Sequence, residues 1–242
     1  MPALERTVWI ILIVALIGNI GLWLLTKNYK SKWANVPPAP TKLAASGAGL
    51  GDSTFAYRSY GIMLQNMGDS GGRVTSLRDY NYDNISDWFM LLHSFDQTSN
   101  FVPYIASYYY GGLDKHTERL NPLVDYLAIA GNSTEGEKWR WLAQAAYLAR
   151  FKVEDLDRAL ELARQLAVLD NPKIPGWAKH MEANVLNARG EKEASYQLLV
   201  SILRDKGDQM PIAEVNATRA YICEQILTPE QVKENPLCEG EF

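Results

Sequence analysis

The chain has 242 residues, of which 47% are hydrophobic and 21% are charged, the usual balance for a protein that packs a core. Its formal net charge of -4 excludes a strongly basic protein drawn to nucleic acid by its overall field. The two cysteines, Cys223 and Cys238, form no CxxC pair. This spacing excludes a zinc ribbon and a thioredoxin-type motif, and leaves open whether the pair forms a disulfide.

An uncharged apolar segment runs from Val8 to Leu25, with Trp9 and Trp23 near its ends. Its length is close to the roughly 20 residues that a membrane-spanning helix needs, and aromatic residues are common at membrane interfaces. A cleaved signal peptide has a shorter apolar region and a nearby small-residue cleavage site. The segment therefore predicts an uncleaved single-pass anchor within residues 1–32.

One face of this predicted helix carries Ala15, Gly18, Asn19 and Leu22, which include two small residues and one polar residue. Their spacing places them one above another on the helix. Small residues permit close approach of a second helix, and an amide in lipid needs a hydrogen-bond partner. We expect a helix–helix contact within the membrane at this face, the alternative being an asparagine that is tolerated facing lipid.

Two signals disagree on the side of the membrane that holds the rest of the chain. Arg6 precedes the span, whereas Lys27, Lys30 and Lys32 follow it, and the positive-inside rule would keep the following domain in the cytoplasm. Long domains can translocate largely regardless of charge, and the cysteine pair suits an oxidising compartment. We expect an inner-membrane protein with a periplasmic domain, with a cytoplasmic domain as the alternative.

Residues 33–53 are rich in Pro, Ala, Gly and Ser and show no apolar period. Such a composition is typical of a semi-extended spacer. Residues 54–103 are expected to form an N-terminal helical region. It begins with an amphipathic helix in which Phe55, Tyr57 and Tyr60 recur at helical intervals. Ser53 is the expected N-cap of this helix.

The helix is followed by the sequence GDSGG, residues 68–72, which resembles the nucleophile loop of trypsin-like serine proteases. That family needs a histidine and an aspartate upstream on a β-barrel scaffold, but no histidine precedes Ser70 in this chain. A hydrolase that uses Ser70 or a carboxylate site between helices is therefore kept only as an alternative. The motif is interpreted as a glycine-rich turn between two helices.

From Asp83 onward the apolar residues follow helical periods. Two longer segments, which begin at Trp139 and Pro175, look alike and carry the matching tryptophans Trp141 and Trp177. These tryptophans are 36 residues apart (177 − 141), and Ala159 and Ala194 are 35 apart (194 − 159). Each segment has an apolar helix, a short polar turn and a second apolar helix, the pattern of an α-solenoid built from helical hairpins.

These segments resemble tetratricopeptide repeats, a family of stacked helical hairpins with a 34-residue period. The resemblance is carried by two sets of residues, Trp141, Ala145, Leu148, Ala159, Ala163 and Pro172, and Trp177, Ala183, Leu186, Gly190 and Ala194. Turn lengths depart from the family pattern, and both units run slightly long. The resemblance implies a fold that is all-α, and a surface that binds protein partners.

The repeat region is expected over residues 104–227, with Ile212–Leu227 as a helix that caps the open end of the array. Residues 228–242 are expected as a C-terminal tail. Three consecutive tyrosines, Tyr108, Tyr109 and Tyr110, point about 100° apart on a helix. At least one of them should leave the core as a candidate partner surface, the alternative being a broad buried face.

No metal, cofactor or catalytic site is expected. The three histidines, His93, His116 and His180, are scattered, and the chain has no HExxH motif. The carboxylates of Asp155, Asp157 and Glu161 are interpreted as a solvated helix face.

The sequence as a whole predicts a membrane-anchored scaffold or accessory subunit, not an enzyme. It would bind protein partners, expected to be subunits of a membrane or envelope complex, through its helical repeats. An alternative that is also not an enzyme is a purely structural subunit of an envelope machine.

Overall fold

The computed structural model describes residues 2–27, 35–67, 69–70, 73–113 and 117–240. Helices form almost all of the elements in these ranges, which confirms an all-α fold. The first part contains α1 (Pro2–Thr26), α2 (Lys42–Ala48), α3 (Ser53–Gln65), the short strands β1 (Asp69–Ser70) and β2 (Arg73–Val74), the 3₁₀ turn η1 (Leu77–Asp79) and α4 (Tyr82–Phe95).

The middle part contains α5 (Phe101–Tyr104), η2 (Ile105–Tyr109), η3 (Tyr110–Gly112), η4 (Glu118–Leu120), α6 (Asn121–Gly131), α7 (Trp139–Leu148), η5 (Ala149–Val153) and α8 (Leu156–Val168). The last part contains α9 (Gly176–Lys179), α10 (Met181–Ala188), α11 (Lys192–Lys206), η6 (Gly207–Gln209), α12 (Ile212–Tyr221), η7 (Ile222–Ile226), α13 (Pro229–Glu234) and η8 (Pro236–Cys238).

The helix α1 is long and apolar enough to cross a membrane. Its candidate span covers Arg6–Thr26 with a mean hydropathy of 2.5, and none of that span is buried against the rest of the described chain. The apolar residues from Val8 to Leu25 therefore lie on one continuous helix.

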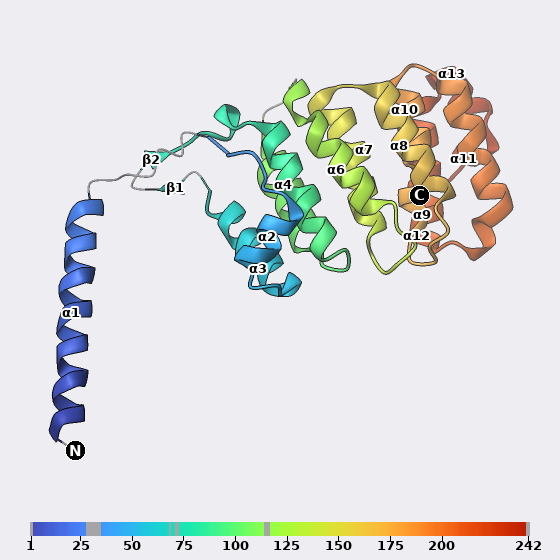
Figure 1. Cartoon of the computed structure of the whole chain (residues 1–242). Coiled ribbons are helices and arrows are strands. Elements are labelled where there is room, and N and C mark those ends of the chain that lie inside the picture. Colours follow the sequence, from blue (N-terminus) through green and yellow to red (C-terminus); the bar gives the residue numbers. More distant parts are fainter. Residues whose placement is uncertain (1, 28–34, 68, 71–72, 114–116, 241–242) are drawn as a thin grey trace.

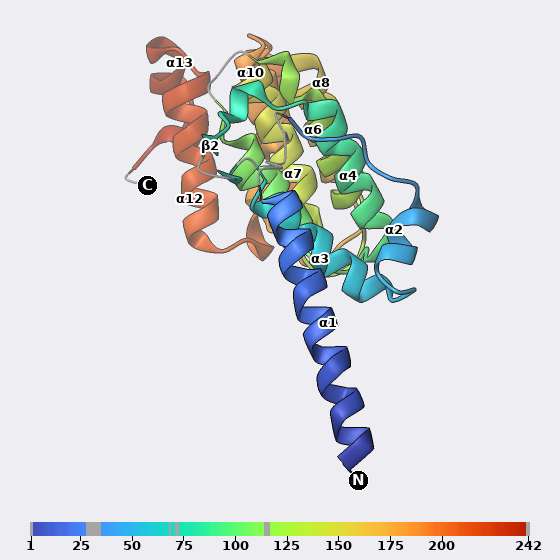
Figure 2. The same cartoon turned by 60° about the vertical axis from the view of Figure 1, so that its left-hand side comes forward.

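The remaining helices stack side by side in chain order. Helix α4 packs on α6, α6 on α7, α7 on α8, α8 on α10, and α10 on α11, an arrangement visible from two directions (Figures 1 and 2). The closest approach is between α6 and α7, where a Cβ on Gly131 would overlap the backbone nitrogen of Leu142. A larger residue at position 131 would force these two helices apart.

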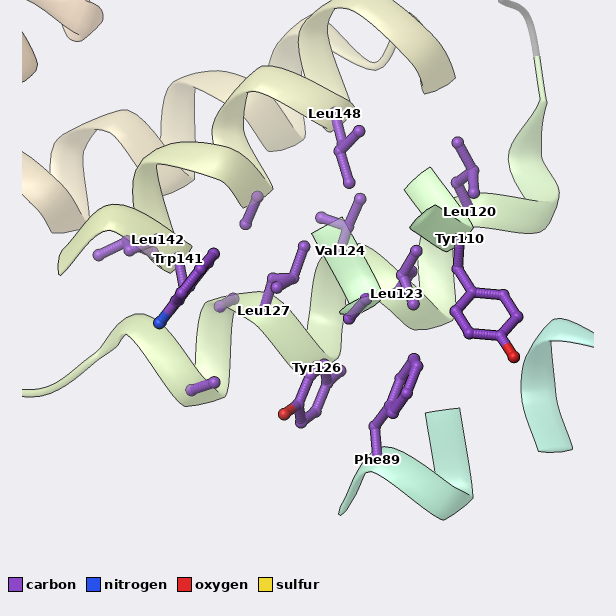
Figure 3. Close-up of a cluster of buried hydrophobic side chains, with 14 of the residues drawn as sticks. Phe89, Tyr110, Leu120, Leu123, Val124, Tyr126, Leu127, Trp141, Leu142 and Leu148 are labelled. Atoms are coloured by element: carbon purple, nitrogen blue, oxygen red, sulfur yellow. The ribbon is translucent and has the colours of Figure 1, made fainter. Parts of the chain in front are cut away.

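The main hydrophobic core extends without interruption from Val36 to Leu186. Its centre is aromatic: the ring of Phe89 on α4 lies 5.5 Å from that of Tyr110 and 5.2 Å from that of Tyr126, with leucines of α6 and α7 around them (Figure 3). The core therefore continues across the expected boundary between residues 54–103 and residues 104–227.

The segment predicted as a spacer, residues 33–53, is instead part of the folded body over its described residues. It contains α2, and Val36 and Ala45 are buried in the main core. The Trp88 indole nitrogen donates a 2.9 Å hydrogen bond to the Pro37 carbonyl, and the Asn84 amide donates one of 2.7 Å to the Val36 carbonyl. The prediction was wrong because these partners lie far away in the sequence and cannot be inferred from local composition.

The two segments that predicted a repeat differ in how they pack. In the first segment Trp141, Ala145, Leu148, Ala159 and Ala163 are all buried. In the second, Ala183 and Leu186 are buried, but Trp177 is 56% exposed and Ala194 is also exposed.

The residues after Trp177 and Ala194 take the buried positions. Ala178 and Ser195 are both fully buried, and the Ser195 hydroxyl donates a 2.8 Å hydrogen bond to the Ala183 carbonyl. The predicted alignment of the second unit was therefore wrong by one residue at these points. As predicted, a polar turn separates the two helices of each segment, with Glu154 (φ 65°) before α8 and Gly190 (φ 84°) before α11.

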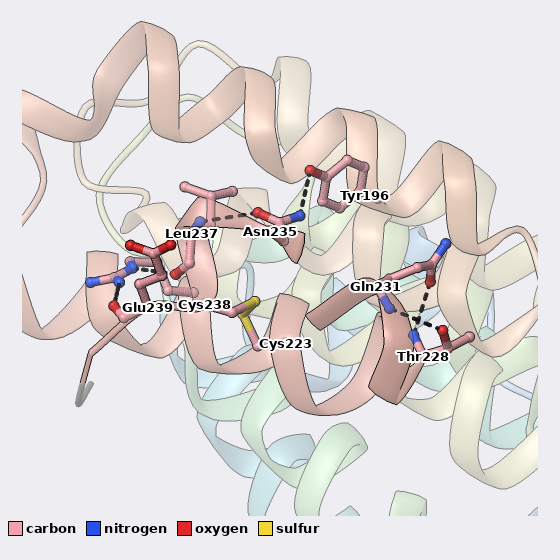
Figure 4. The surroundings of a disulfide bond; sticks show 9 residues. Tyr196, Cys223, Thr228, Gln231, Asn235, Leu237, Cys238 and Glu239 are labelled. Carbon is pink, nitrogen blue, oxygen red and sulfur yellow. Dashed lines mark hydrogen bonds between the residues drawn. A yellow bond between two sulfur atoms is a disulfide. The ribbon is translucent and has the colours of Figure 1, made fainter. Parts of the chain in front are cut away.

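A separate, smaller core lies at the C-terminal end of the stack, where α12 and η7 cover α11. Its buried members are Ala183, Leu199, Ile222, Cys223 and Ile226. The predicted tail, residues 228–242, contains α13 and η8 in its described part, and Cys238 is joined to Cys223 by a disulfide with 5.8 Å between the Cα atoms. Figure 4 shows the segment held further by Asn235, which donates a 2.8 Å hydrogen bond to the Tyr196 hydroxyl.

Candidate partner-binding surface

Two pairs of exposed aromatic residues lie on neighbouring elements of the stack. Tyr104 and Tyr108, at the junction of α5 and η2, are 57% and 56% exposed, and their ring centroids are 4.9 Å apart. Tyr147 and Phe151, at the junction of α7 and η5, are 45% and 39% exposed and are also 4.9 Å apart. In each pair the residues are four positions apart, so they share one helix face.

A glutamine side chain connects the two elements. The Ser107 hydroxyl donates a 3.2 Å hydrogen bond to Oε1 of Gln144, and Nε2 of Gln144 donates one of 3.2 Å to the Tyr108 hydroxyl. Because both ends of the amide are used, the Tyr108 ring is held in a defined position relative to α7. The exposed rings are thus presented by a supported surface.

A groove of about 290 Å³ lies between these elements. We call it the aromatic groove; it is lined by Ser107, Tyr108, Gly111, Gly112, Gln144, Tyr147, Leu148 and Lys152. Gly111 permits its depth, since a Cβ there would lie 3.3 Å from the Leu148 methyl groups. The Lys152 ammonium donates a 2.7 Å hydrogen bond to the Leu113 carbonyl, which fixes one wall.

The backbone is irregular on both sides of the aromatic groove. The segments Ile105–Tyr109 and Ala149–Val153 are widened π-helical turns. Such turns redirect side chains relative to a regular helix and are frequent at functional sites. The second one ends at Glu154 in a left-handed conformation, after which Asp155 caps α8 by accepting a hydrogen bond from the Arg158 amide.

A positive charge lies at the rim beside Phe151. The guanidinium carbon of Arg150 is 4.5 Å from the centre of the Phe151 ring. A guanidinium at this distance is attracted by the negative face of the ring. The rim therefore offers aromatic faces together with a cation, the combination that is enriched where proteins bind other proteins.

The three predicted tyrosines have three different environments. Tyr108 lines the aromatic groove. Tyr109 is 44% exposed, but its ring packs edge-on against Tyr110 at 4.9 Å and does not line the groove. Tyr110 is fully buried, and its hydroxyl donates a 2.7 Å hydrogen bond to the Leu64 carbonyl. The prediction of Tyr110 as a surface residue was wrong, since this hydroxyl finds its acceptor inside the core.

Sequence reasoning missed Tyr104, Gln144, Tyr147 and Phe151 as members of this surface. The sequence did contain a signal for the pair on α7 and η5. Tyr147 and Phe151 are four residues apart, and their spacing places them outside the helix face that carries Trp141 and Leu148. That they face the tyrosines of η2 depends on how the two elements pack.

The predicted intramembrane face remains a prediction. Ala15, Gly18, Asn19 and Leu22 are all exposed on α1. Their side chains are available to a second helix, and nothing in the described part of this chain covers them.

The carboxylates named for the hydrolase alternative are each engaged in a helix cap or an ion pair. Ser70 belongs to β1, whose backbone pairs with β2, and its side chain lies outside the described part of the molecule. Asp155 caps a helix, Asp157 pairs with Arg189, and Glu161 lies 2.7 Å from Arg158. These carboxylates are engaged on a solvated face.

The histidines are separated. His116 lies outside the described residues, whereas His93 contacts Tyr126 and His180 lies between α9 and α10. Within the described ranges, no group of three or more His, Cys, Asp or Glu side chains is placed to hold a metal ion.

Comparisons of this chain with protein-family models, with curated proteins and with solved structures find no match.

Proposed function

We propose that this chain is a membrane-anchored scaffold or accessory subunit that binds a protein partner at the aromatic groove. The observation that carries the proposal is the two exposed aromatic pairs on neighbouring elements, with Tyr108 of the first pair held by a hydrogen bond from Gln144 of α7. Tyrosine and arginine supply much of the binding energy in protein interfaces. A rigid presentation lowers the entropy that binding costs.

The stacked helices support a description as tetratricopeptide-like repeats. The hairpins α7–α8 and α10–α11 pack through α8 and α10, and stacks of this kind present extended binding surfaces. The unit that contains Trp141 and Ala159 carries the buried pattern best. Neither a cofactor nor a catalytic step is part of the proposal.

We place the protein in the inner membrane as a single-pass protein with its helical body in the periplasm. The apolar helix α1 supports the anchor. The Cys223–Cys238 disulfide supports an oxidising compartment, because structural disulfides are rare in proteins exposed to cytosolic reductants. Confinement near the bilayer would raise the effective concentration of the groove for membrane partners.

The test is affinity purification of the full chain from mild detergent, followed by mass spectrometry. The variant Tyr108→Ala/Tyr147→Ala removes one ring from each aromatic pair. Loss of two central aromatic contacts should lower the recovery of the bound partner by about tenfold or more, since hot-spot residues each contribute about 2 kcal/mol or more.

The matched control is Phe55→Ala, which removes an aromatic ring that is 52% exposed on α3 and does not line the groove. Its partner recovery should equal that of the wild type. A stable, stoichiometric complex that survives the double substitution unchanged would contradict the groove and would favour the purely structural subunit.

The intramembrane face is tested separately by Asn19→Leu. If the amide bonds to a partner helix, this change should weaken co-purification of a membrane partner by a few-fold, because such hydrogen bonds contribute about 0.6–2 kcal/mol. Unchanged recovery of every membrane partner would remove this contact from the proposal.

The placement in the periplasm is tested by trapping the thiols in intact cells with N-ethylmaleimide. With the body in the periplasm, neither cysteine should be alkylated until a reductant is added. Alkylation of both cysteines without reductant would instead place the body in the cytoplasm.

A further inference from the structure

A second cavity, of about 190 Å³, lies at the C-terminal end of the stack between α9, α10, α11 and α12; Figure 1 shows α9 and α12 close together there. We call it the histidine pocket; it is lined by Trp177, His180, Asn184, Leu199, Glu214, Ala217, Thr218 and Tyr221. None of these residues belongs to the aromatic groove, which is formed by η2, η3, α7 and η5.

The imidazole of His180 presents an unused acceptor. The side chain is only 7% exposed, and its Nδ1 lies 3.4 Å from the Thr218 hydroxyl oxygen. That hydroxyl already donates its hydrogen to the Glu214 carbonyl at 2.8 Å, so it accepts the hydrogen of Nδ1. Nε2 is then the lone-pair nitrogen of a neutral ring, and it has no hydrogen-bond partner among the described residues.

The carboxylate of Glu214 presents a second unused acceptor. Its Oε1 is buried and has no partner among the residues that the structure describes. The carboxylate lies directly against Gly176, where an added Cβ would overlap Oε1. The absence of a side chain at position 176 is therefore what allows a carboxylate to reach this place. A buried carboxylate oxygen without a hydrogen-bond donor carries a free-energy cost that a bound donor removes.

The charge and shape of the histidine pocket define what can supply that donor. Both unused atoms are acceptors, and the described lining residues include one carboxylate but neither lysine nor arginine. The rings of Trp177 and Tyr221 add faces that attract cations. The cavity is smaller than the roughly 300–1,000 Å³ of most small-molecule sites. These properties suit a compact cation with several hydrogen-bond donors.

We propose that the histidine pocket binds a primary ammonium group carried on an alkyl chain, as in a lysine side chain or a free alkylamine. The ammonium has three donors and no acceptor, which matches the carboxylate of Glu214 on the wall of the pocket. The alkyl chain lies along Leu199 and the aromatic rings. This site is independent of the aromatic groove, so either proposal can fail without the other.

The test is a ligand-observed saturation-transfer NMR titration of the full chain in detergent micelles. The probes are Nα-acetyl-lysine methylamide, n-butylamine and Nα-acetyl-norleucine methylamide, the last having the alkyl chain without the charge. Both amines should bind, and the norleucine derivative should bind at least tenfold more weakly. If the lysine derivative binds more tightly than butylamine, the natural ligand of the pocket is a lysine side chain of a peptide. If butylamine binds more tightly, the natural ligand is a free amine.

The variant Glu214→Gln keeps the shape of the side chain and removes its charge. It should weaken amine binding by about tenfold or more, the effect expected for a hydrogen bond between charged groups. The matched control Glu224→Gln, at an exposed position on η7, should bind as the wild type does. Trp177→Ala removes a 56% exposed ring that lines the pocket and packs edge-on against the Trp139 ring at 5.8 Å, and it should weaken binding several-fold.

Equal binding of the lysine and norleucine derivatives would overturn the proposal. So would unchanged amine affinity in both Glu214→Gln and Trp177→Ala. Tighter binding of Nα-acetyl-arginine methylamide than of the lysine derivative would overturn the assignment of an ammonium ligand.

Discussion

The two ends of the helical body are stabilised in different ways. The larger core is built around the ring of Phe89, which packs edge-on against Tyr110 and at a tilt against Tyr126, and it extends from Val36 to Leu186. The C-terminal core has five buried residues and is closed by a disulfide between Cys223 and Cys238. The comparison indicates that apolar burial suffices where many helices converge, whereas the last helices of a stack have only one neighbour and need a covalent link and polar contacts.

The largest effect should come from opening the aromatic core. Phe89→Ala removes a fully buried ring and should lower the free energy of unfolding by about 3–5 kcal/mol, through lost burial and the cavity that remains. Urea unfolding of the full chain in mild detergent, followed by circular dichroism, measures the change. Phe55→Ala at an exposed position should change it by less than about 0.5 kcal/mol. Similar losses in the two variants would contradict the aromatic core as the main source of stability.

The disulfide should come next, and its effect should stay local. Cys223→Ser/Cys238→Ser opens a link between residues 15 apart in sequence, which a chain-entropy model values at about 3 kcal/mol. Hydrogen exchange should become faster in α12, η7 and α13 and remain unchanged in α6 and α7. Chemical reduction of the wild type should give the same pattern. Faster exchange throughout the stack would show that the two cores unfold as one unit.

A smaller effect is expected from one hydroxyl in the large core. Tyr110→Phe removes the 2.7 Å hydrogen bond to the Leu64 carbonyl and leaves that carbonyl with only the longer, 3.2 Å bond from the Met67 amide, a loss of about 1 kcal/mol. The matched change Tyr108→Phe at a 56% exposed ring should be close to neutral in the same urea unfolding measurement. Equal losses of unfolding free energy in the two variants would mean that the hydrogen bond from Tyr110 to the Leu64 carbonyl does not stabilise the fold.

The smallest effect should be a dependence of stability on pH in both regions. Burial lowers the pKa of His93 and of His180, and the charge of Lys138 lowers that of His93 further, against the opposing charge of Asp96. As the pH falls below about 6.5, the unfolded chain binds protons before the folded one. Stability should therefore decrease from that pH down to the lowered pKa values.

Single substitutions separate the two contributions. His93→Gln should remove part of the pH dependence in α4 and α6, and His180→Gln part of that in α10 and α12, where Glu214 and Thr218 face the ring. Hydrogen exchange at pH 7.5 and pH 5.5 provides the comparison. An increase in stability on acidification would contradict a lowered pKa for the two histidines.

Several predictions failed where residues far apart in sequence meet. Residues 33–53 were expected to form a spacer, yet Val36 is buried, and two side chains of α4 bond this segment: Asn84 donates to the Val36 carbonyl and Trp88 to the Pro37 carbonyl. Trp177 was expected to match Trp141, but it lies exposed beside the histidine pocket. Local composition and spacing carry no information about which distant donor or ring will be adjacent.

The sequence by itself determined the apolar helix α1, the all-α body and the polar turns at Glu154 and Gly190, because hydrophobic periods and turn residues act over a few neighbouring positions. Three relations emerged only from the packing of the helices: which of three consecutive tyrosines is buried, the hydrogen bond from Gln144 of α7 to Tyr108 of η2, and the placing of His180 and Glu214 on one cavity. These relations depend on how helices approach one another. Close approaches such as that at Gly131 are set by the packing of the whole stack.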